Sequence, residues 1–275
     1  MDRDWRRSFG YTPNWKNPRD LNEKIQWLIT YGDTSRWTEL ADKVRVKDYV
    51  IKCGYPDIVV PTLGVWDRAE DVDFDTLPRK FVIKCNHDSG STYLVDKDKG
   101  FDEGRLREDL KCHLQDKFGY RFGEMYYNSI KPRILAEKFL EGYDSDVSSS
   151  IIDYKIWCFG GVPTGILTCF DRKKESLRMN QYDVGWNVHP EWSVFSDTFR
   201  DGQGLLQRPK NLEYMLEIAA KLSSGFPEVR VDLYDLGGKV YFGEMTFSSL
   251  CGKMTYYSKE YLKQLGEQVI LPRRK

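Results

Sequence analysis

Several features are scarce in this sequence, and each scarcity excludes a class of protein. Only 3 of the 275 residues are histidine, which leaves little room for a histidine-rich metal site. The 42 lysines and arginines are balanced by 42 aspartates and glutamates, so the basic excess typical of proteins on nucleic acids or anionic membranes is missing. We therefore expect no nucleic-acid partner.

Long hydrophobic runs are missing as well. No stretch reaches the roughly 18 apolar residues of a membrane-spanning helix, and the charged residues 1–7 lack the apolar segment of a signal peptide. The six cysteines are scattered without a Cys-x-x-Cys pair, which is typical of reduced, buried thiols. These features favour a cytoplasmic protein without a membrane span.

The common nucleotide-binding and hydrolase signatures are also absent. The chain has no Gly-x-x-x-x-Gly-Lys-Ser/Thr, no Gly-x-Gly-x-x-Gly after a strand, no His-Glu-x-x-His and no Gly-x-Ser-x-Gly. What it does have is 40% hydrophobic and 31% charged residues, a balance typical of a globular protein. Any catalytic site must therefore be found in less familiar patterns.

Hydrophobic periodicity divides the chain at about residue 75. The region 1–75 is predicted to be mainly helical, with helices over 21–30 and 37–52. In the region 76–275, segments with the hydrophobic period of a helix alternate with segments that have the period of a strand, which predicts an α+β domain. Its expected strands are 81–85, 92–95, 133–140, 151–159, 162–170, 229–234 and 239–247; its expected helices are 102–118 and 211–224; and 172–210 is expected to be mostly irregular.

Four short patterns in the chain carry possible chemistry. The first is Lys84 at a strand end, followed by the small residues of a hairpin tip, Asp88, Ser89, Gly90 and Ser91. Such a tip lets backbone N–H groups approach a phosphate, while a lysine supplies charge. An ordinary hairpin turn is the simpler interpretation of the same residues.

The second and third patterns each centre on a charged pair. Glu137 and Lys138, followed by Phe139 and Leu140, end a strand with a carboxylate and a free backbone edge, both suited to an adenine ring. The pair Asp42-Lys43 begins an apolar-periodic stretch. Taken alone, each pair is more simply interpreted as charged residues on a solvated surface.

The fourth pattern is a hairpin that carries two carboxylates. Asp232 lies on one strand and Glu244 on the next, with Gly237-Gly238 between them. A two-residue turn would pair Asp232 with Gly243 and place Glu244 on the other face. We predict an odd-length loop, which pairs Asp232 directly with Glu244 and suits Mg²⁺.

Together these patterns resemble the ATP-grasp fold, and the chain from about residue 16 to its end is similar to the TupA-like (teichuronopeptide-biosynthesis-like) ATP-grasp family. The resemblance implies two α+β subdomains that grip ATP, over about 76–140 and 150–275, after the helical region. The stretches that carry it are 22–28, 41–43, 63–67, 84–91, 131–133, 153–155, 230–234 and 242–244.

The resemblance also implies roles for individual residues. Those that would bind ATP are Lys43 and Lys84 at the α- and β-phosphates, the loop of Asp88, Ser89, Gly90 and Ser91, then Glu137, Lys138, Phe139 and Leu140 at adenine, and Asp144 at the ribose. Asp232 and Glu244 would hold Mg²⁺, and Arg230 would steady the γ-phosphate. Thr246 stands where many relatives have asparagine, which puts a second metal ion in question. For the remaining γ-phosphate contact, Lys155, Arg172 and Arg178 are candidates, Arg172 being the least specific.

The activity implied is that of a carboxylate–amine ligase that forms an amide through an acyl phosphate. The family connection indicates polysaccharide biosynthesis for a capsule or cell envelope, with a uronic-acid glycan or its precursor as carboxylate and an amino acid or other amine as acceptor. A phosphotransferase acting on a glycan hydroxyl and a non-catalytic glycan-binding module are the alternatives. Trp186 and Trp192 fit sugar stacking and core packing equally well.

Overall fold

The computed structural model describes residues 2–142 and 147–274. The chain forms two compact units, one of residues 35–141 and one of residues 1–34 together with 142–275. The division therefore differs from the expected boundary near residue 75. Residues 35–75 belong to the first unit because β1 (Thr62–Trp66) pairs with β4 (Ile134–Lys138) in its sheet.

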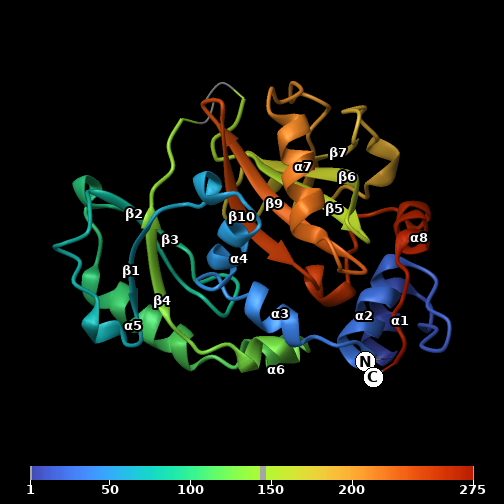
Figure 1. Cartoon of the computed structure of the whole chain (residues 1–275), viewed down its shortest axis with the longest axis horizontal. Helices are drawn as coiled ribbons and strands as arrows, with labels where there is room; N and C mark the ends of the chain where they lie inside the picture. Colours follow the sequence, from blue (N-terminus) through green and yellow to red (C-terminus); the bar gives the residue numbers. More distant parts are fainter. Residues whose placement is uncertain (1, 143–146, 275) are drawn as a thin grey trace. The chain divides into compact units, whose positions relative to one another are not determined.

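The unit of residues 35–141 contains a four-stranded antiparallel sheet in the order β1-β4-β2-β3 (Figure 1). Its other strands are β2 (Lys80–Cys85) and β3 (Tyr93–Asp96), and its helices are α3 (Ser35–Leu40), α4 (Val46–Lys52), α5 (Glu103–Gln115) and α6 (Phe118–Phe122). The core forms where the apolar side of β2 meets α5, with Phe81, Ile83, Leu106 and Leu110 among its buried members.

The helix expected over 37–52 is two helices, α3 and α4, and a buried aspartate accounts for the break between them. Asp42 is 1% exposed, and its Oδ1 accepts hydrogen bonds from the backbone N–H of Val44 at 2.9 Å and from the Asn86 amide at 2.8 Å. A side chain that captures its own backbone two residues ahead competes with helical hydrogen bonding. Asp42 is therefore a structural anchor of this unit.

The other unit contains a six-stranded sheet in the order β10-β9-β5-β6-β7-β8. Its strands are β5 (Asp153–Phe159), β6 (Val162–Phe170), β7 (Leu177–Asp183), β8 (Phe199–Asp201), β9 (Val229–Leu236) and β10 (Lys239–Thr246). Its helices are α1 (Asp2–Phe9), α2 (Leu21–Tyr31), α7 (Leu212–Ser223) and α8 (Lys259–Gln268). The expectation that 172–210 is mostly irregular missed β7 and β8, because β7 mixes polar and apolar residues.

The two faces of this sheet differ in chemistry. Helix α7 packs on β5, β6 and β9 (Figure 1), and its Ser223 hydroxyl bonds the Cys158 thiol of β5. Because strand side chains alternate, residues one position away from Cys158 face the other side. On that side Lys155 pairs in register with Asp232 of β9, so charged side chains gather opposite the helix.

The β9–β10 hairpin brings Asp232 opposite Glu244, but not by the expected route. The odd-length loop is wrong: Leu236 pairs with Lys239 across a two-residue turn, in which Gly237 and Gly238 have φ of 59° and 79°. A β-bulge at Gly243 then shifts the register by one residue. The pairing of Asp232 with Glu244 is therefore confirmed, and a bulge produces it.

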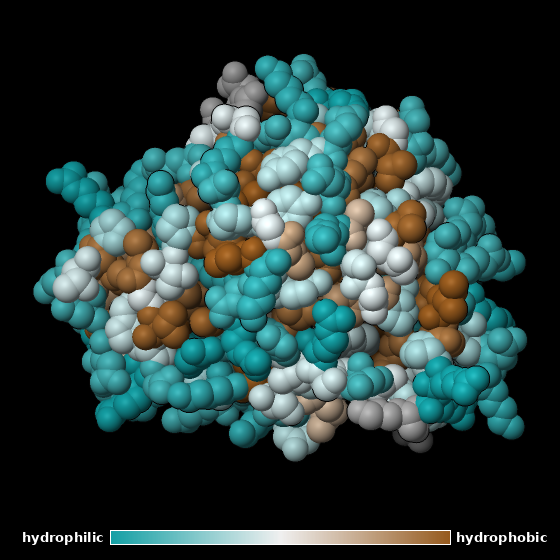
Figure 2. All heavy atoms as spheres, viewed as in Figure 1, coloured by the Kyte–Doolittle hydropathy of each residue, from teal (hydrophilic) through white to brown (hydrophobic). Residues whose placement is uncertain are grey.

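Figure 2 shows a mainly hydrophilic face, with its hydrophobic areas small and separate. Within the described part of the chain, none of the helices has the length and apolar character needed to cross a membrane. The exposed apolar residues on this face thus resemble those of an ordinary protein surface.

Replacing Gly243 with alanine tests the bulge. A Cβ there would lie 2.9 Å from the Asp232 carbonyl oxygen, too close without backbone movement. We expect Gly243→Ala to lower the free energy of unfolding by about 1–3 kcal/mol. The control Gly104→Ala, whose Cβ would meet Asp102 at an ordinary 3.5 Å, should change it by about 1 kcal/mol or less. Equal stability of both variants in urea titrations would show that the bulge is not required.

Candidate functional site

The residues that sequence analysis singles out fall into two clusters, one in each unit. The first surrounds Glu137 on β4, whose backbone pairs with Val82 of β2. Glu137 accepts from the Lys84 ammonium at 2.5 Å and from the Lys47 ammonium at 2.6 Å. Burial alone would raise the pKa of Glu137, but the two lysines hold it below its ordinary value.

Lys47 was not among the expected site residues. Its Nζ also donates to the Val60 carbonyl at 2.9 Å and to the Thr62 hydroxyl at 2.7 Å. Lys43, which was expected, donates instead to the backbone carbonyl of Asp88. The two lysines lie four residues apart, and only the turn at Asp42 decides which one reaches Glu137, so no local signal separates them.

The loop 88–91 has a buried base and an exposed tip. Asp88 and Ser91 are 1% exposed, whereas Ser89 and Gly90 are exposed. The Asp88 carboxylate accepts from the Ser91 hydroxyl at 2.5 Å and lies 2.7 Å from Nδ1 of His113. Ser91 in turn accepts from the Cys85 N–H at 2.9 Å. The base is thereby fixed, while backbone at the tip is accessible to a ligand.

The segment after Glu137 is less uniform than expected. The Lys138 side chain is exposed, and its N–H donates to the Pro61 carbonyl at 2.9 Å. Phe139 is half-buried with the Lys80 ammonium 5.9 Å from its ring centre, and Leu140 is buried. Asp144 lies outside the described residues.

The second cluster surrounds Asp232 on the six-stranded sheet. Oδ1 of Asp232 accepts from Nε of Arg230 at 2.7 Å, and Oδ2 accepts from Nη2 of Arg230 at 2.8 Å and from Lys155 at 2.5 Å. Arg230 also donates to the Thr246 hydroxyl at 3.1 Å and lies 3.6 Å from the Glu244 carboxylate. The strands thus bring all five residues together.

Burial gives this cluster its electrostatic character. Asp232 is 1% exposed, and burial alone would raise the pKa of its carboxyl group. The cations of Arg230 and Lys155 outweigh that effect and hold the pKa of Asp232 below its ordinary value. Glu244, with a side chain 46% exposed, remains open to a ligand. The cluster therefore pairs a fixed, ionised carboxylate with an accessible one.

The two other expected arginines lie in different places. Arg172 pairs with Asp153, whose carboxylate lies 3.7 Å from Nζ of Lys155, so Arg172 extends the charged cluster. Arg178 pairs in register with Phe170, one position from the Cys169–Asp153 row, and so lies on the opposite face of the sheet. Its nearest charge is Asp171, at 3.6 Å.

A turn that follows β10 provides one more hydrogen-bond partner for Arg230. Nη1 of Arg230 donates to the Ser249 hydroxyl at 2.7 Å. Next to Ser249, Leu250 and Cys251 have left-handed φ of 47° and 52°, a strained conformation for such residues. The Gln26 amide donates to the Cys251 carbonyl and helps hold this turn. Sequence analysis did not identify Gln26, because its partner lies 225 residues away.

The tryptophans considered for sugar stacking pack against other aromatic rings. Trp186 stacks on Tyr182 with ring centres 4.0 Å apart. Trp192 stacks on His189 at 3.9 Å and on Tyr261 at 4.2 Å. Both indoles are half-buried, so each packs at the margin of the core rather than inside it.

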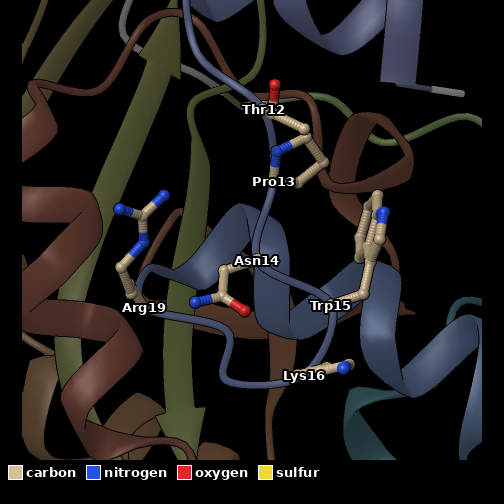
Figure 3. A pocket seen from close by; sticks show the side chains of 6 residues that line it. All are labelled: Thr12, Pro13, Asn14, Trp15, Lys16 and Arg19. Carbon is tan, nitrogen blue, oxygen red and sulfur yellow. The ribbon is translucent and has the colours of Figure 1, made fainter.

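An open hollow of about 490 Å³ lies in the loop between α1 and α2. Figure 3 shows Trp15 and Arg19 on its opposite sides, with Asn14 between them. Arg19 is already paired with Glu23 at 3.1 Å. The hollow has a tryptophan and polar groups, as many sugar sites do, and Arg19 is one of its two cationic residues, the other being Lys16.

Comparison with known proteins identifies the class. The sequence model of the TupA-like ATP-grasp family matches residues 23–270, which is most of the chain. The protein is thus an ATP-grasp protein of α+β fold. Within that class, the chain belongs to the TupA-like ATP-grasp family. No curated protein matches it.

Several solved structures are similar in fold. The D-alanine–D-alanine ligase of Bacillus anthracis is 16% identical over 83% of this chain, with a TM-score of 0.44. That of Helicobacter pylori is 15% identical over 94%, with a TM-score of 0.47, and phosphoribosylamine–glycine ligase of Thermotoga maritima is 14% identical over 78%, with a TM-score of 0.45. The chain spans 65%, 68% and 49% of their respective lengths.

Removing the Asp232 charge should destabilise the protein strongly. Asp232→Asn leaves two buried cations without their counter-ion, and we expect a loss of about 3–5 kcal/mol in the free energy of unfolding. Glu244→Gln changes the half-exposed carboxylate opposite Asp232 in the hairpin, and this variant should lose only about 0–1 kcal/mol in the free energy of unfolding. Urea titration of both variants provides the measurement, and a small effect of Asp232→Asn would contradict the described charge network.

Glu137 should make the free energy of unfolding depend on pH in the acidic range. Because its folded pKa lies below the ordinary 4.5, its contribution is complete above that ordinary value and is lost as the pH falls through the folded pKa. Glu137→Gln should therefore be less stable at neutral pH, and the difference from wild type should shrink towards about pH 3. Thermal unfolding across this range gives the comparison, and a constant difference would contradict the expectation.

Proposed function

We propose that this protein is an ATP-dependent carboxylate–amine ligase. In this proposal it joins an amino acid or other amine to the carboxylate of a uronic-acid glycan, or its precursor, during assembly of a bacterial surface polysaccharide. The observation that carries the proposal is the direct pairing of Asp232 with Glu244 in an ATP-grasp protein, beside the cations of Arg230 and Lys155. Because ATP is the co-substrate, we propose that the reaction occurs in the cytoplasm.

The Glu137 cluster supports a role in binding the nucleotide. We propose that Lys84 and Lys43 neutralise the α- and β-phosphates and that the tip of the loop 88–91 donates backbone N–H groups to them. Lys47 joins them as a further candidate, since it already shares Glu137 with Lys84. A carboxylate has about four acceptor positions, so Glu137 retains capacity for an adenine amino group.

The Asp232 cluster fits a magnesium ion. Asp232 and Glu244 supply hard carboxylate oxygens on one face of the hairpin, and the Thr246 hydroxyl is close to the same arginine. Within residues 2–142 and 147–274, no cluster of three or more acidic, histidine or cysteine side chains suits a metal, so phosphate oxygens and water would complete the coordination. When bound, Mg²⁺ neutralises phosphate charge and orients the phosphates for transfer.

The proposed reaction has two displacement steps. An oxygen of the substrate carboxylate attacks the γ-phosphorus, the bond to the β–γ bridging oxygen breaks, and ADP leaves. The amine nitrogen then attacks the acyl carbon, the bond to the phosphate oxygen breaks, a proton leaves the nitrogen, and inorganic phosphate departs. Arg230, held in place by Asp232 and Ser249, is suited to holding the transferred phosphoryl group.

The proposal predicts amine-dependent release of phosphate. With ATP, Mg²⁺, a uronic-acid oligosaccharide and an amine, wild type should yield ADP, phosphate and an amide detectable by mass spectrometry. Glu244→Gln should reduce the rate by about 100-fold or more, because several kcal/mol of charge stabilisation are lost.

Lys174→Ala, an exposed change in the 172–174 loop, is the control and should retain the wild-type rate. A stable phosphate ester formed without the amine would support a phosphotransferase instead. The absence of any ATP turnover with every carboxylate tested would argue against a ligase.

A further inference from the structure

The loop 88–91 begins with an acidic residue, although its tip is proposed to bind phosphates. A carboxylate that faced the same ligand would repel it, because like charges repel strongly where little water screens them. The side chain of Asp88 is instead turned into the protein, where it is 1% exposed, while Ser89 and Gly90 at the tip are exposed. The contacts that hold this carboxylate inside therefore decide whether the loop suits an anionic ligand.

One of these contacts comes from a histidine outside the loop. Nδ1 of His113 lies 2.7 Å from Oδ2 of Asp88, and Nδ1 is the donor because a carboxylate oxygen accepts. The other oxygen, Oδ1, accepts from the hydroxyl of Ser91, which belongs to the loop itself. Of these two partners, only His113 ties the loop to another element of the fold.

Helix α5 gives His113 a fixed position. The spacing of Leu106, Leu110 and His113 places all three on one face of the helix. The two leucines are buried in the core, and the Cys85 thiol at the end of β2 lies 3.9 Å from the Leu110 carbonyl oxygen. On the other side of the loop, the ring of Tyr93, the first residue of β3, lies edge-to-face to the imidazole with ring centres 6.4 Å apart. His113 is therefore packed against both strands that flank the loop.

Asp88 in turn positions two groups that are proposed to bind phosphate. Its backbone carbonyl accepts a hydrogen bond from the ammonium group of Lys43. Its carboxylate holds the Ser91 hydroxyl, which accepts from the Cys85 N–H at 2.9 Å and so fixes the far end of the loop to β2. A residue that fixes Asp88 thereby fixes both Lys43 and the loop.

We infer that His113 is a positioning residue for phosphate binding and that it acts through Asp88. It keeps the Asp88 carboxylate away from phosphate and sets the positions of Lys43 and the loop 88–91. A loop that is ordered beforehand binds its ligand more tightly, because it loses less conformational freedom on binding. The inference rests on the proposed function for the identity of the ligand, and His113 itself need not touch ATP.

Two variants of the same shape test this role. Asparagine places an amide nitrogen where Nδ1 of His113 stands, whereas leucine has the same branched shape and no donor. In calorimetric titrations of the intact protein with ATP and Mg²⁺, His113→Leu should raise the Kd about 10-fold or more, and His113→Asn should stay within about threefold of wild type. Gln115→Leu, an exposed change in the same helical turn, is the control and should leave the Kd unchanged. Equal Kd values for the leucine and asparagine variants of His113 would overturn the inference.

Kinetics separate positioning from a general loss of folded protein. Contacts to the α- and β-phosphates stabilise substrate and transition state alike, so His113→Leu should raise the KM for ATP and leave kcat near wild type. A lower kcat at unchanged KM is the result expected of less folded enzyme, and it would contradict the role.

A double variant tests whether His113 acts through Asp88. In the background of Asp88→Ala, His113→Leu should have no further effect on the Kd for ATP, because the group that it positions is gone. Effects that add in the double variant would show that His113 acts by another route, and the inference would be wrong.

Hydrogen exchange of the free protein distinguishes this inference from the proposed function. The Cys85 N–H donates to Ser91, so its exchange reports on the base of the loop without ATP. We expect this exchange to be about 10-fold or more faster in His113→Leu than in wild type, and near wild type in His113→Asn. Unchanged exchange in His113→Leu would overturn the inference even in an active ligase. A wild type that binds no ATP would contradict the proposed function, while the exchange rates still decide whether His113 holds the loop.

Discussion

The buried ion cluster at Asp232 is the constraint on which the charged face of the six-stranded sheet depends. A carboxylate that is 1% exposed would ordinarily be protonated, and it stays ionised because Arg230 and Lys155 contact both of its oxygens. The same contacts orient the arginine towards Thr246 and Ser249. One buried charge thereby fixes the positions of the groups around the proposed metal site.

The Glu137 cluster repeats this arrangement with different cations. There one buried carboxylate holds two lysines, whereas at Asp232 one carboxylate holds a lysine and an arginine. A chain with no net charge can therefore contain two sites with strong local fields. The scarcity of histidine fits the proposed chemistry, because ATP and Mg²⁺ supply most of what a histidine would otherwise provide.

Much of the fold could be predicted from local patterns, and the exceptions have physical reasons. The hairpins over 151–170 and 229–247 appear near their expected positions because strand periodicity is a local property. The helix expected over 37–52 is broken because Asp42 bonds Asn86, 44 residues away. The strand β7 was missed because its polar Asn180 and Gln181 are buried, which hydrophobic periodicity does not reveal.

For the candidate sites, the sequence by itself determined which residue types are available and which share a strand face, such as Arg230 with Asp232 and Glu244 with Thr246. Only the tertiary structure decided which of these meet. The bulge at Gly243 set the pairing across the hairpin, and the turn at Asp42 put Lys47 rather than Lys43 on Glu137. The bulge appears only when β9 and β10 form their ladder, and the turn at Asp42 is held by the Asn86 side chain, 44 residues away. Neither contact exists until these segments are packed together.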